Sequence, residues 1–217
     1  MKFDKMIITS EKAHFKNSIN GKNQNTFKTP PISTVVGILK NVYGQDINNF
    51  IFGYTFEYDT TFKDAVTIYK EINPNVKSLT CKERFTTDIC FIEYLVNPVL
   101  TIYSNINIKP IITDILNLGK TDCLAKANFP KEKVEIISKD TTGYNQWIPI
   151  NIGNGKIQRI NLETRYNPKK GYYDYYTKQL RLNKEFKSNY CITDSKEGIQ
   201  LWKYEGIGDI KCCQEKL

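Results

Sequence analysis

The chain has 217 residues, which is enough for one large domain or for a core domain with a smaller one beside it. Hydrophobic residues make up 40% and charged residues 25% of it, as in water-soluble globular proteins, and no apolar run approaches the length that spans a membrane. A formal charge of +8 favours a polyanionic partner such as nucleic acid, and we expect no secretory signal at Met1–Lys5, because that opening is polar.

The positive charge is carried almost entirely by lysine. The four arginines are Arg84, Arg159, Arg165 and Arg181. Lysine is a mobile point charge suited to phosphates, whereas arginine suits two-pronged recognition of base edges. The balance favours contact with a nucleic-acid backbone over sequence reading.

The six cysteines form no framework. They are Cys81, Cys90, Cys123, Cys191, Cys212 and Cys213. There is no C-x-x-C pair and one histidine, so we expect no zinc site, no cofactor, and reduced thiols in a cytoplasmic protein.

The chain opens with a predicted strand, Lys2–Thr9, followed by a polar, basic segment, Lys16–Thr29, predicted as a loop. Its polar side chains include Lys16, Asn17, Asn20, Lys22, Asn23, Gln24, Asn25, Thr26 and Lys28. Amide side chains bond bases and lysines hold phosphates, so the mixture suits a single RNA strand. The alternative, equally favoured by the sequence, is a solvated loop without a binding role in a protein rich in lysine and asparagine.

The next segment predicts a well-bounded helix that ends at Gly44. Pro30 and Pro31 keep the incoming chain extended, Ser33 occupies the expected N-cap, and Gly44 can adopt the left-handed closing conformation. Gly37, inside the helix, predicts close backbone approach. The free amides at the amino end, with the lysines around them, make a candidate anion site, although a capped helix buried on a sheet is the commoner arrangement.

The residues Phe52, Tyr54, Phe56 and Tyr58 alternate along a predicted strand. They form either a base-stacking platform or a core face under the helix. We favour the core, because the opposite face is small and acidic and the aromatic consensus of stacking RNA-recognition strands is absent.

A strand at Val66–Tyr69 leads to a turn and then to a basic excursion, Val76–Asp88, that carries Lys77, Lys82 and Arg84. Two strong strands follow, Ile89–Val96 and Val99–Ser104, joined by a turn.

A second helix is predicted from Pro110 to the residue before Gly119. The order β-α-β-β…β-β-α is consistent with a ferredoxin-like half carrying an insertion. Gly119, Lys120 and Thr121 then form either a ligand-approaching turn or an ordinary glycine helix cap.

Beyond about Ala127 the pattern changes to short strands. These are predicted at Val134–Ile137, Ile148–Ile152, Ile157–Ile160 and Leu201–Tyr204, with a turn at 153–155 and a frayed end from Lys211. The tract Arg165–Arg181, dense in lysine and tyrosine, either stacks bases or packs one tyrosine face inward. His14, near a strand end without an evident carboxylate partner, is interpreted as structural or RNA-contacting rather than catalytic.

Two of these segments resemble the Cas-five family of CRISPR-associated proteins, in which a polar loop leads to a T-F/Y…P-P-x-S-x-x-x-G-x-L helix. The matching residues are Thr26, Phe27, Pro30, Pro31, Ser33, Gly37 and Leu39. Leu118–Asp122 resembles the same family's L-G-[RK]-[ST]-[ED] element. The likeness covers about two thirds of the chain, best in Ser10–Gly44 and Glu93–Ala125.

The resemblance implies a subunit of a type I CRISPR surveillance complex (Cascade), closest to type I-B, in antiviral defence. It implies an α+β fold: a ferredoxin-like, RRM-like (RAMP) palm over residues 1–127, a thumb β-hairpin at about 74–90, and a mostly β C-terminal extension over 128–217. The implied partners are the 5′ handle of crRNA, a backbone subunit, a large subunit and nearby target DNA, with no membrane. The implied RNA-binding residues are Lys16, Lys22, Asn23, Gln24, Thr26, Lys28, Ser33, Lys77, Lys82, Arg84, Gly119, Lys120 and Thr121.

The subunit is expected to be non-catalytic. In the I-C subtype of that family the equivalent subunit is an endoribonuclease that matures the guide without a metal, and that remains the alternative. Here Thr121 follows Lys120 where a histidine would be sought. A phosphate-binding α+β domain without an RNA role is a third interpretation.

Overall fold

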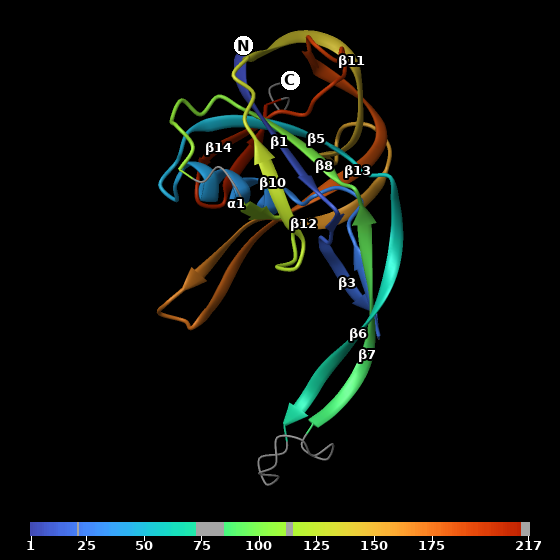
Figure 1. The fold of residues 1–217 in the computed structure, drawn as a ribbon. Helices are drawn as coiled ribbons and strands as arrows, with labels where there is room; N and C mark the ends of the chain where they lie inside the picture. The colour runs from blue at the N-terminus through green and yellow to red at the C-terminus, as the bar shows by residue number, and fades with distance from the viewer. Residues whose placement is uncertain (21, 73–84, 112–114, 214–217) are drawn as a thin grey trace.

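The computed structural model describes residues 1–20, 22–72, 85–111 and 115–213, and this part of the chain forms two β-sheets and one α-helix (Figure 1). The elements are β1 (Lys2–Ser10), β2 (Lys12–Ala13), β3 (Lys16–Asn20), β4 (Asn23–Thr26), α1 (Ile32–Tyr43), β5 (Phe50–Glu57), β6 (Thr60–Ile72), β7 (Phe85–Val96), β8 (Val99–Ser104), β9 (Ile115–Asn117), β10 (Leu124–Asn128), β11 (Val134–Pro149), β12 (Lys156–Asn167), β13 (Tyr172–Ile192), β14 (Trp202–Gly206) and β15 (Asp209–Cys212). The described part of the chain is therefore mostly β, with a single helix, where the expected fold was α+β.

The larger sheet is built around three antiparallel strands, β1, β8 and β5. Strands β11, β13 and β12 extend it beyond β1, and β14 and β15 extend it beyond β5, while β10 and β9 also lie on the β1 side. Residues after 128 thus share a sheet with the first part of the chain. The expected boundary near residue 127 stays a prediction.

Helix α1 packs its apolar stripe into the main hydrophobic core together with the aromatic side chains of β5. Phe52, Tyr54 and Phe56 are buried, which confirms that this face is core and not a stacking platform. The carbonyl of Pro30 accepts hydrogen bonds from the Tyr54 hydroxyl at 2.9 Å and from the Trp147 indole at 3.2 Å. These two buried bonds fix the extended backbone just before the helix begins.

Both ends of α1 lie close to the expected positions, but the capping details differ. Pro31 is the N-cap and Ser33 already lies inside the first turn, without a side-chain cap hydrogen bond, so the prediction of a serine cap is wrong. The φ angle of Pro31, −60°, is preset by its ring, so Pro31 takes the N-cap position and the helix begins at Ile32, one residue before Ser33. Gly44 closes the helix as predicted, with a positive φ of 106°, but its ψ of 152° differs from the left-handed helical conformation that was expected. The close backbone approach expected at Gly37 is wrong, because no atom lies within 4 Å of where a Cβ would be.

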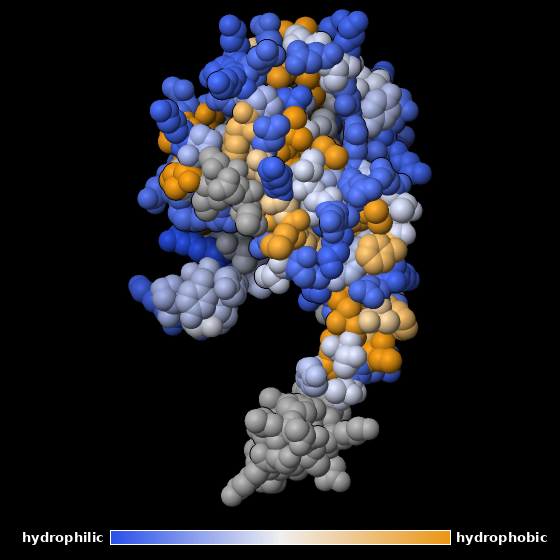
Figure 2. Space-filling view, viewed as in Figure 1, coloured by the Kyte–Doolittle hydropathy of each residue, from blue (hydrophilic) through white to orange (hydrophobic). Residues whose placement is uncertain are grey.

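The lead-in segment predicted as a loop forms the antiparallel hairpin β3–β4, and β4 also pairs in parallel with β7. Strands β6 and β7 form an arm that extends from the body (Figure 1). The arm begins at Thr60 and ends at Val96, so it is longer than the thumb expected at about 74–90. Exposed hydrophobic side chains line it (Figure 2); they are Phe62, Tyr69, Ile89 and Phe91. Residues 73–84, with the expected sites Lys77, Lys82 and Arg84, lie outside the described residues.

The second helix expected before Gly119 is wrong for the residues described there. Ile115–Asn117 is strand β9, which pairs with β10. Leu116 and Leu118 are buried and Asn117 is exposed, so the segment has the twofold alternation of a strand rather than a helical period.

The C-terminal part holds the two longest strands among the described residues, β13 and β11. The two strands predicted within 134–152 are one continuous strand, β11, which pairs with β13 across a bulge. β12 and β13 form a ribbon whose turn projects from the body (Figure 1). Lys211, expected in a frayed end, lies in β15. Among the described residues, no helix has both the length and the apolar character of a membrane span.

Candidate nucleic-acid interface

A surface groove of about 680 Å³ lies where the start of α1 meets β3, β4, the Gly119 turn and the β12–β13 ribbon. Its lining residues are His14, Phe15, Lys16, Asn17, Gln24, Phe27, Pro31, Ser33, Thr34, Gly119, Lys120, Arg159, Asn161 and Thr177. Three of these side chains are cationic, and none of these lining residues is a carboxylate. The groove therefore has the composition expected of a site for a polyanion.

The groove brings together five of the residues predicted from sequence, namely Lys16, Gln24, Ser33, Gly119 and Lys120. They come from three segments separated by as many as a hundred positions in the sequence. Because Pro31 is the N-cap of α1, the amides of Ile32 and Ser33 precede the first intrahelical hydrogen bonds and are available to an acceptor.

Gly119 shapes one wall of the groove. Its φ angle is +88°, and a Cβ at this position would lie 2.0 Å from the carbonyl oxygen of His14. The two residues form an isolated parallel β-bridge, and the amide of His14 donates to the carbonyl of Leu118 at 3.3 Å. Only glycine permits this contact, which sets Lys120 beside the groove.

Lys120 is held by a small polar cluster. Its Nζ donates to the hydroxyl of Tyr94 at 3.1 Å and lies 3.5 Å from Asp122, which also pairs with Lys12 at 3.1 Å. Burial alone would lower the pKa of Lys120, but its hydrogen bond to Tyr94 and the charge of Asp122 outweigh burial and raise it. Lys120 is thus a fixed cation at neutral pH.

His14 forms the floor of the groove and is 3% exposed. Its Nδ1 lies 2.7 Å from the carbonyl of Glu93, which can only accept, so Nδ1 carries the proton and Nε2 is the unprotonated nitrogen. Burial lowers the pKa of the ring, so His14 is neutral at physiological pH. Within the described part of the chain, Nε2 is buried without a hydrogen-bond partner, as is Oδ1 of Asn161 in the same lining.

Other predicted site residues have structural roles outside the groove. Lys28 pairs with Glu93 at 2.8 Å, and the other oxygen of Glu93 accepts the amide of Thr26 at 3.1 Å. Burial would raise the pKa of Glu93, but these two hydrogen bonds outweigh burial and lower it. The Thr26 side chain is buried and accepts the amide of Phe15 at 2.8 Å.

Three further predicted residues also lie outside this lining. Lys22 pairs with Asp88 at 2.7 Å, so part of its charge is neutralised within the protein. Asn23 lies at the start of β4, opposite Phe91 of β7. Thr121 is exposed in the turn closed by the hydrogen bond from Cys123 to Lys120.

The sequence did not point to Arg159, Asn161 or Thr177 as site residues. Arg159 and Asn161 come from β12 and Thr177 from β13, and the register of this ribbon places Asn161 opposite Thr177. The density of tyrosine and lysine at 165–181 indicated RNA contact as one of two interpretations of this tract. It did not indicate that the β12–β13 ribbon packs near the start of α1, because that position depends on tertiary packing.

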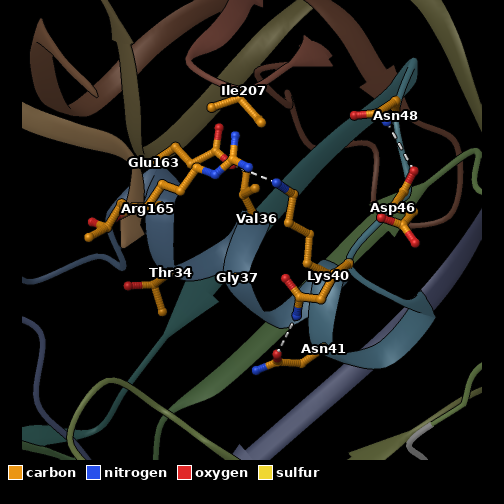
Figure 3. A pocket seen from close by; sticks show the side chains of 13 residues that line it. Thr34, Val36, Gly37, Lys40, Asn41, Asp46, Asn48, Glu163, Arg165 and Ile207 are labelled. Atoms are coloured by element: carbon orange, nitrogen blue, oxygen red, sulfur yellow. Dashed lines mark hydrogen bonds and ion pairs between the residues drawn. The ribbon is translucent and has the colours of Figure 1, made fainter. Parts of the chain in front are cut away.

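A second hollow, of about 620 Å³, lies on the outer side of α1 (Figure 3). In it Lys40 Nζ lies 2.5 Å from a carboxylate oxygen of Glu163, which also accepts the hydroxyl of Tyr204 and the amide of Gly208. Burial would lower the pKa of Lys40, but the hydrogen bond to Glu163 outweighs burial and raises it. With Asp46 and Arg165 also in the lining, this hollow has two carboxylates against two cations, so it is less favourable to a polyanion than the groove.

No protein-family model and no curated protein matches the sequence. Among solved structures, the chain is similar to a chain in the cryo-EM structure of the type III-B Cmr-beta bound to cognate target RNA and AMPPnP. The two have 13% identity and a TM-score of 0.55, over 84% of this chain and 86% of that one. It also matches a chain of a CRISPR RNA-guided surveillance complex, with 12% identity and a TM-score of 0.45 over 85% and 91%. The protein thus shares its fold with the Cmr-beta chain.

Proposed function

We propose that the protein is a non-catalytic, RNA-binding subunit of a CRISPR ribonucleoprotein, and that its groove holds the 5′ handle of crRNA. The observation that carries the proposal is the groove itself. Residues from the two segments that resemble the Cas-five family line one cationic hollow, without a carboxylate among the lining residues. Phosphates would meet Lys16, Lys120 and Arg159, and bases would meet the amide and hydroxyl side chains.

The fold supports the same proposal. Strands β10, β1, β8 and β5 are neighbours in the larger sheet and would form the palm, and the β6–β7 arm would be the thumb. The fold is also that of a chain in an RNA-bound type III-B complex. The two motifs favour a type I complex, with a backbone subunit and a large subunit as neighbours and target DNA nearby.

The test is binding of a handle-containing RNA to Lys16→Ala and Arg159→Ala variants across a salt series. Each cation that contacts a phosphate lowers the magnitude of the log–log salt slope by about 0.7–0.9 when it is removed. Both side chains are exposed, so the variants are expected to fold normally.

Lys187→Ala is the matched control. This exposed lysine lies ten residues beyond Thr177 on β13, opposite Thr142, and its removal changes the net charge equally. Equal losses in all three variants would show that only the overall charge matters and would overturn the groove as the site.

A metal-independent endoribonuclease is the second candidate, because the structure brings Tyr94, Lys120 and His14 together. The Tyr94 hydroxyl accepts from Lys120, and the Tyr94 and His14 rings are 5.7 Å apart between centroids. However, Nε2, the nitrogen that could accept a proton, is buried and cannot reach an RNA hydroxyl in this conformation. Incubating purified protein with repeat RNA in EDTA separates the candidates: intact RNA supports the handle-binding role, and cleavage lost in His14→Ala would establish the nuclease.

A further inference from the structure

The end of the β12–β13 ribbon carries five exposed tyrosines. They are Tyr166, Tyr172, Tyr173, Tyr175 and Tyr176, of which Tyr175 is 66% exposed. Four basic side chains lie in the same stretch against one acidic side chain, Asp174, within residues 164–178. No exposed aliphatic side chain lies in that stretch, so its exposed surface is aromatic and basic, a composition that suits a single strand of nucleic acid. In Figure 2 the projecting end shows as a pale, intermediate surface.

The register assigns these tyrosines to two faces. Tyr166 lies opposite Tyr173, and Thr164 lies opposite Tyr175, so Tyr166, Tyr173 and Tyr175 share one face. Tyr172 and Tyr176 lie on the other face. There Tyr176 packs against the loop of Gly208, where an added Cβ would come within 2.3 Å of its ring.

The first face continues into the groove. Alternation along β13 places Thr177 on the same side as Tyr175, and Asn161 and Arg159 lie opposite Thr177 and Gln179 on that side. The amide of Asn161 donates to the hydroxyl of Thr164, as expected of side chains on one face. Arg159, Asn161 and Thr177 line the groove, so one continuous surface leads from it to Tyr175 and Tyr173.

The turn of the ribbon is held in a defined conformation. Asn167 accepts the amides of Lys169 and Lys170 at 3.1 and 3.3 Å, and its own amide donates to Asp174 at 2.8 Å. The rings of Tyr166 and Tyr173 meet edge to face, with centroids 5.3 Å apart. The aromatic face is therefore preorganised, which lowers the entropy cost of binding.

We propose that the face formed by Tyr166, Tyr173 and Tyr175 is a stacking platform for the bases of a single RNA strand that leaves the groove. Tyrosine rings stack on any base and lysines attract phosphates, so this contact reads no sequence. The inference rests on the proposed function, because the strand is the one that the groove holds.

The experiment measures the affinity of a minimal handle oligonucleotide and of two extended RNAs at one fixed salt concentration. One RNA is extended by about eight nucleotides at its 5′ end and the other by the same length at its 3′ end, which is within the range of single-strand site sizes. Wild-type protein is expected to bind one extended RNA at least about fivefold more tightly, the lower end of what one stacked base contributes.

Tyr175→Ala and Tyr173→Ala are expected to remove that gain and to leave affinity for the minimal RNA unchanged. Tyr175→Phe keeps the ring and is expected to keep the gain. Tyr172→Ala is the matched control, because Tyr172 is 58% exposed on the opposite face of the same ribbon, so it too is expected to keep the gain. A 2-aminopurine base in the extension reports stacking directly, by quenching that Tyr175→Ala relieves.

The outcomes separate the two proposals. If the minimal RNA binds but the extension adds nothing, or Tyr172→Ala acts like Tyr175→Ala, the platform is overturned and the groove stands. If none of these RNAs binds, the proposed function fails and the platform fails with it. Loss of a protein subunit from the purified complex in Tyr175→Ala, with RNA binding intact, would overturn the platform by showing that the ribbon docks protein.

Discussion

Two hollows of similar size, about 680 and 620 Å³, lie on either side of the amino end of α1, and Ser33 and Thr34 line both. The groove has three cations and no carboxylate in its lining, whereas the outer hollow binds its lysine internally through Glu163. Volume and the helix start therefore do not distinguish them. The charges of the lining do, because the groove has three cations and no carboxylate, whereas the outer hollow has two cations, Lys40 and Arg165, against Glu163 and Asp46.

The largest effect is expected in the outer hollow. Glu163→Ala leaves the mostly buried ammonium of Lys40 unpaired and removes the acceptor of Tyr204 and Gly208. We expect a loss of roughly 3 kcal/mol in the free energy of unfolding, measured by urea denaturation. RNA affinity of the folded fraction should not change.

The matched double variant for that hollow is Lys40→Met with Glu163→Leu. Replacing both charges by apolar groups should restore most of the lost stability. No recovery would mean that the ion pair is not what stabilises this hollow.

Gly119→Ala is expected to damage the groove wall. The added Cβ would clash with the carbonyl of His14 at a φ angle that favours glycine, at a cost of roughly 2–4 kcal/mol, and it should weaken RNA binding as well. Gly171→Ala is the control, because its φ angle is also positive, +72°, but nothing lies within 4 Å of the new Cβ. That change should cost about 1–2 kcal/mol, less than Gly119→Ala, and leave affinity unchanged. Equal costs would show that the contact with His14 is not close.

A smaller effect concerns pH. The pKa of His14 is lowered in the folded protein from an ordinary value of 6.5, so the unfolded chain binds a proton that the folded chain does not. Stability should therefore fall as pH decreases from about 6.5 toward the lowered pKa, by at most about 1.4 kcal/mol per pH unit, and be level above 6.5.

His14→Gln should remove this part of the pH dependence in denaturation curves between pH 5 and 7. If the free energy of unfolding of the variant depends on pH as steeply as that of the wild type, another titrating group causes the dependence.

Local patterns predicted α1, the buried face of β5 and the strands nearest the core, because each depends on periodicity within a few residues. They failed where contact with another segment determines the secondary structure. Ile115 and Leu116 fit a helix in isolation, yet the edge offered by β10 makes the segment a strand. Ser33 has the chemistry of a cap, but the fixed φ angle of Pro31 starts the helix earlier. For the site, the motifs identified the residues on two walls of the groove. Arg159 and Thr177 on the third wall follow from the register of a distant ribbon, which no short pattern encodes.

Photocrosslinking of a 4-thiouridine-substituted handle RNA, followed by mapping of the attached peptides, tests the central claim most directly. We expect cross-links in peptides containing Lys16 and Gln24, Lys120, and Arg159, with few in the peptide of Lys40. Cross-links confined to the outer hollow, or to surfaces that exclude all the groove-lining segments, would contradict that claim.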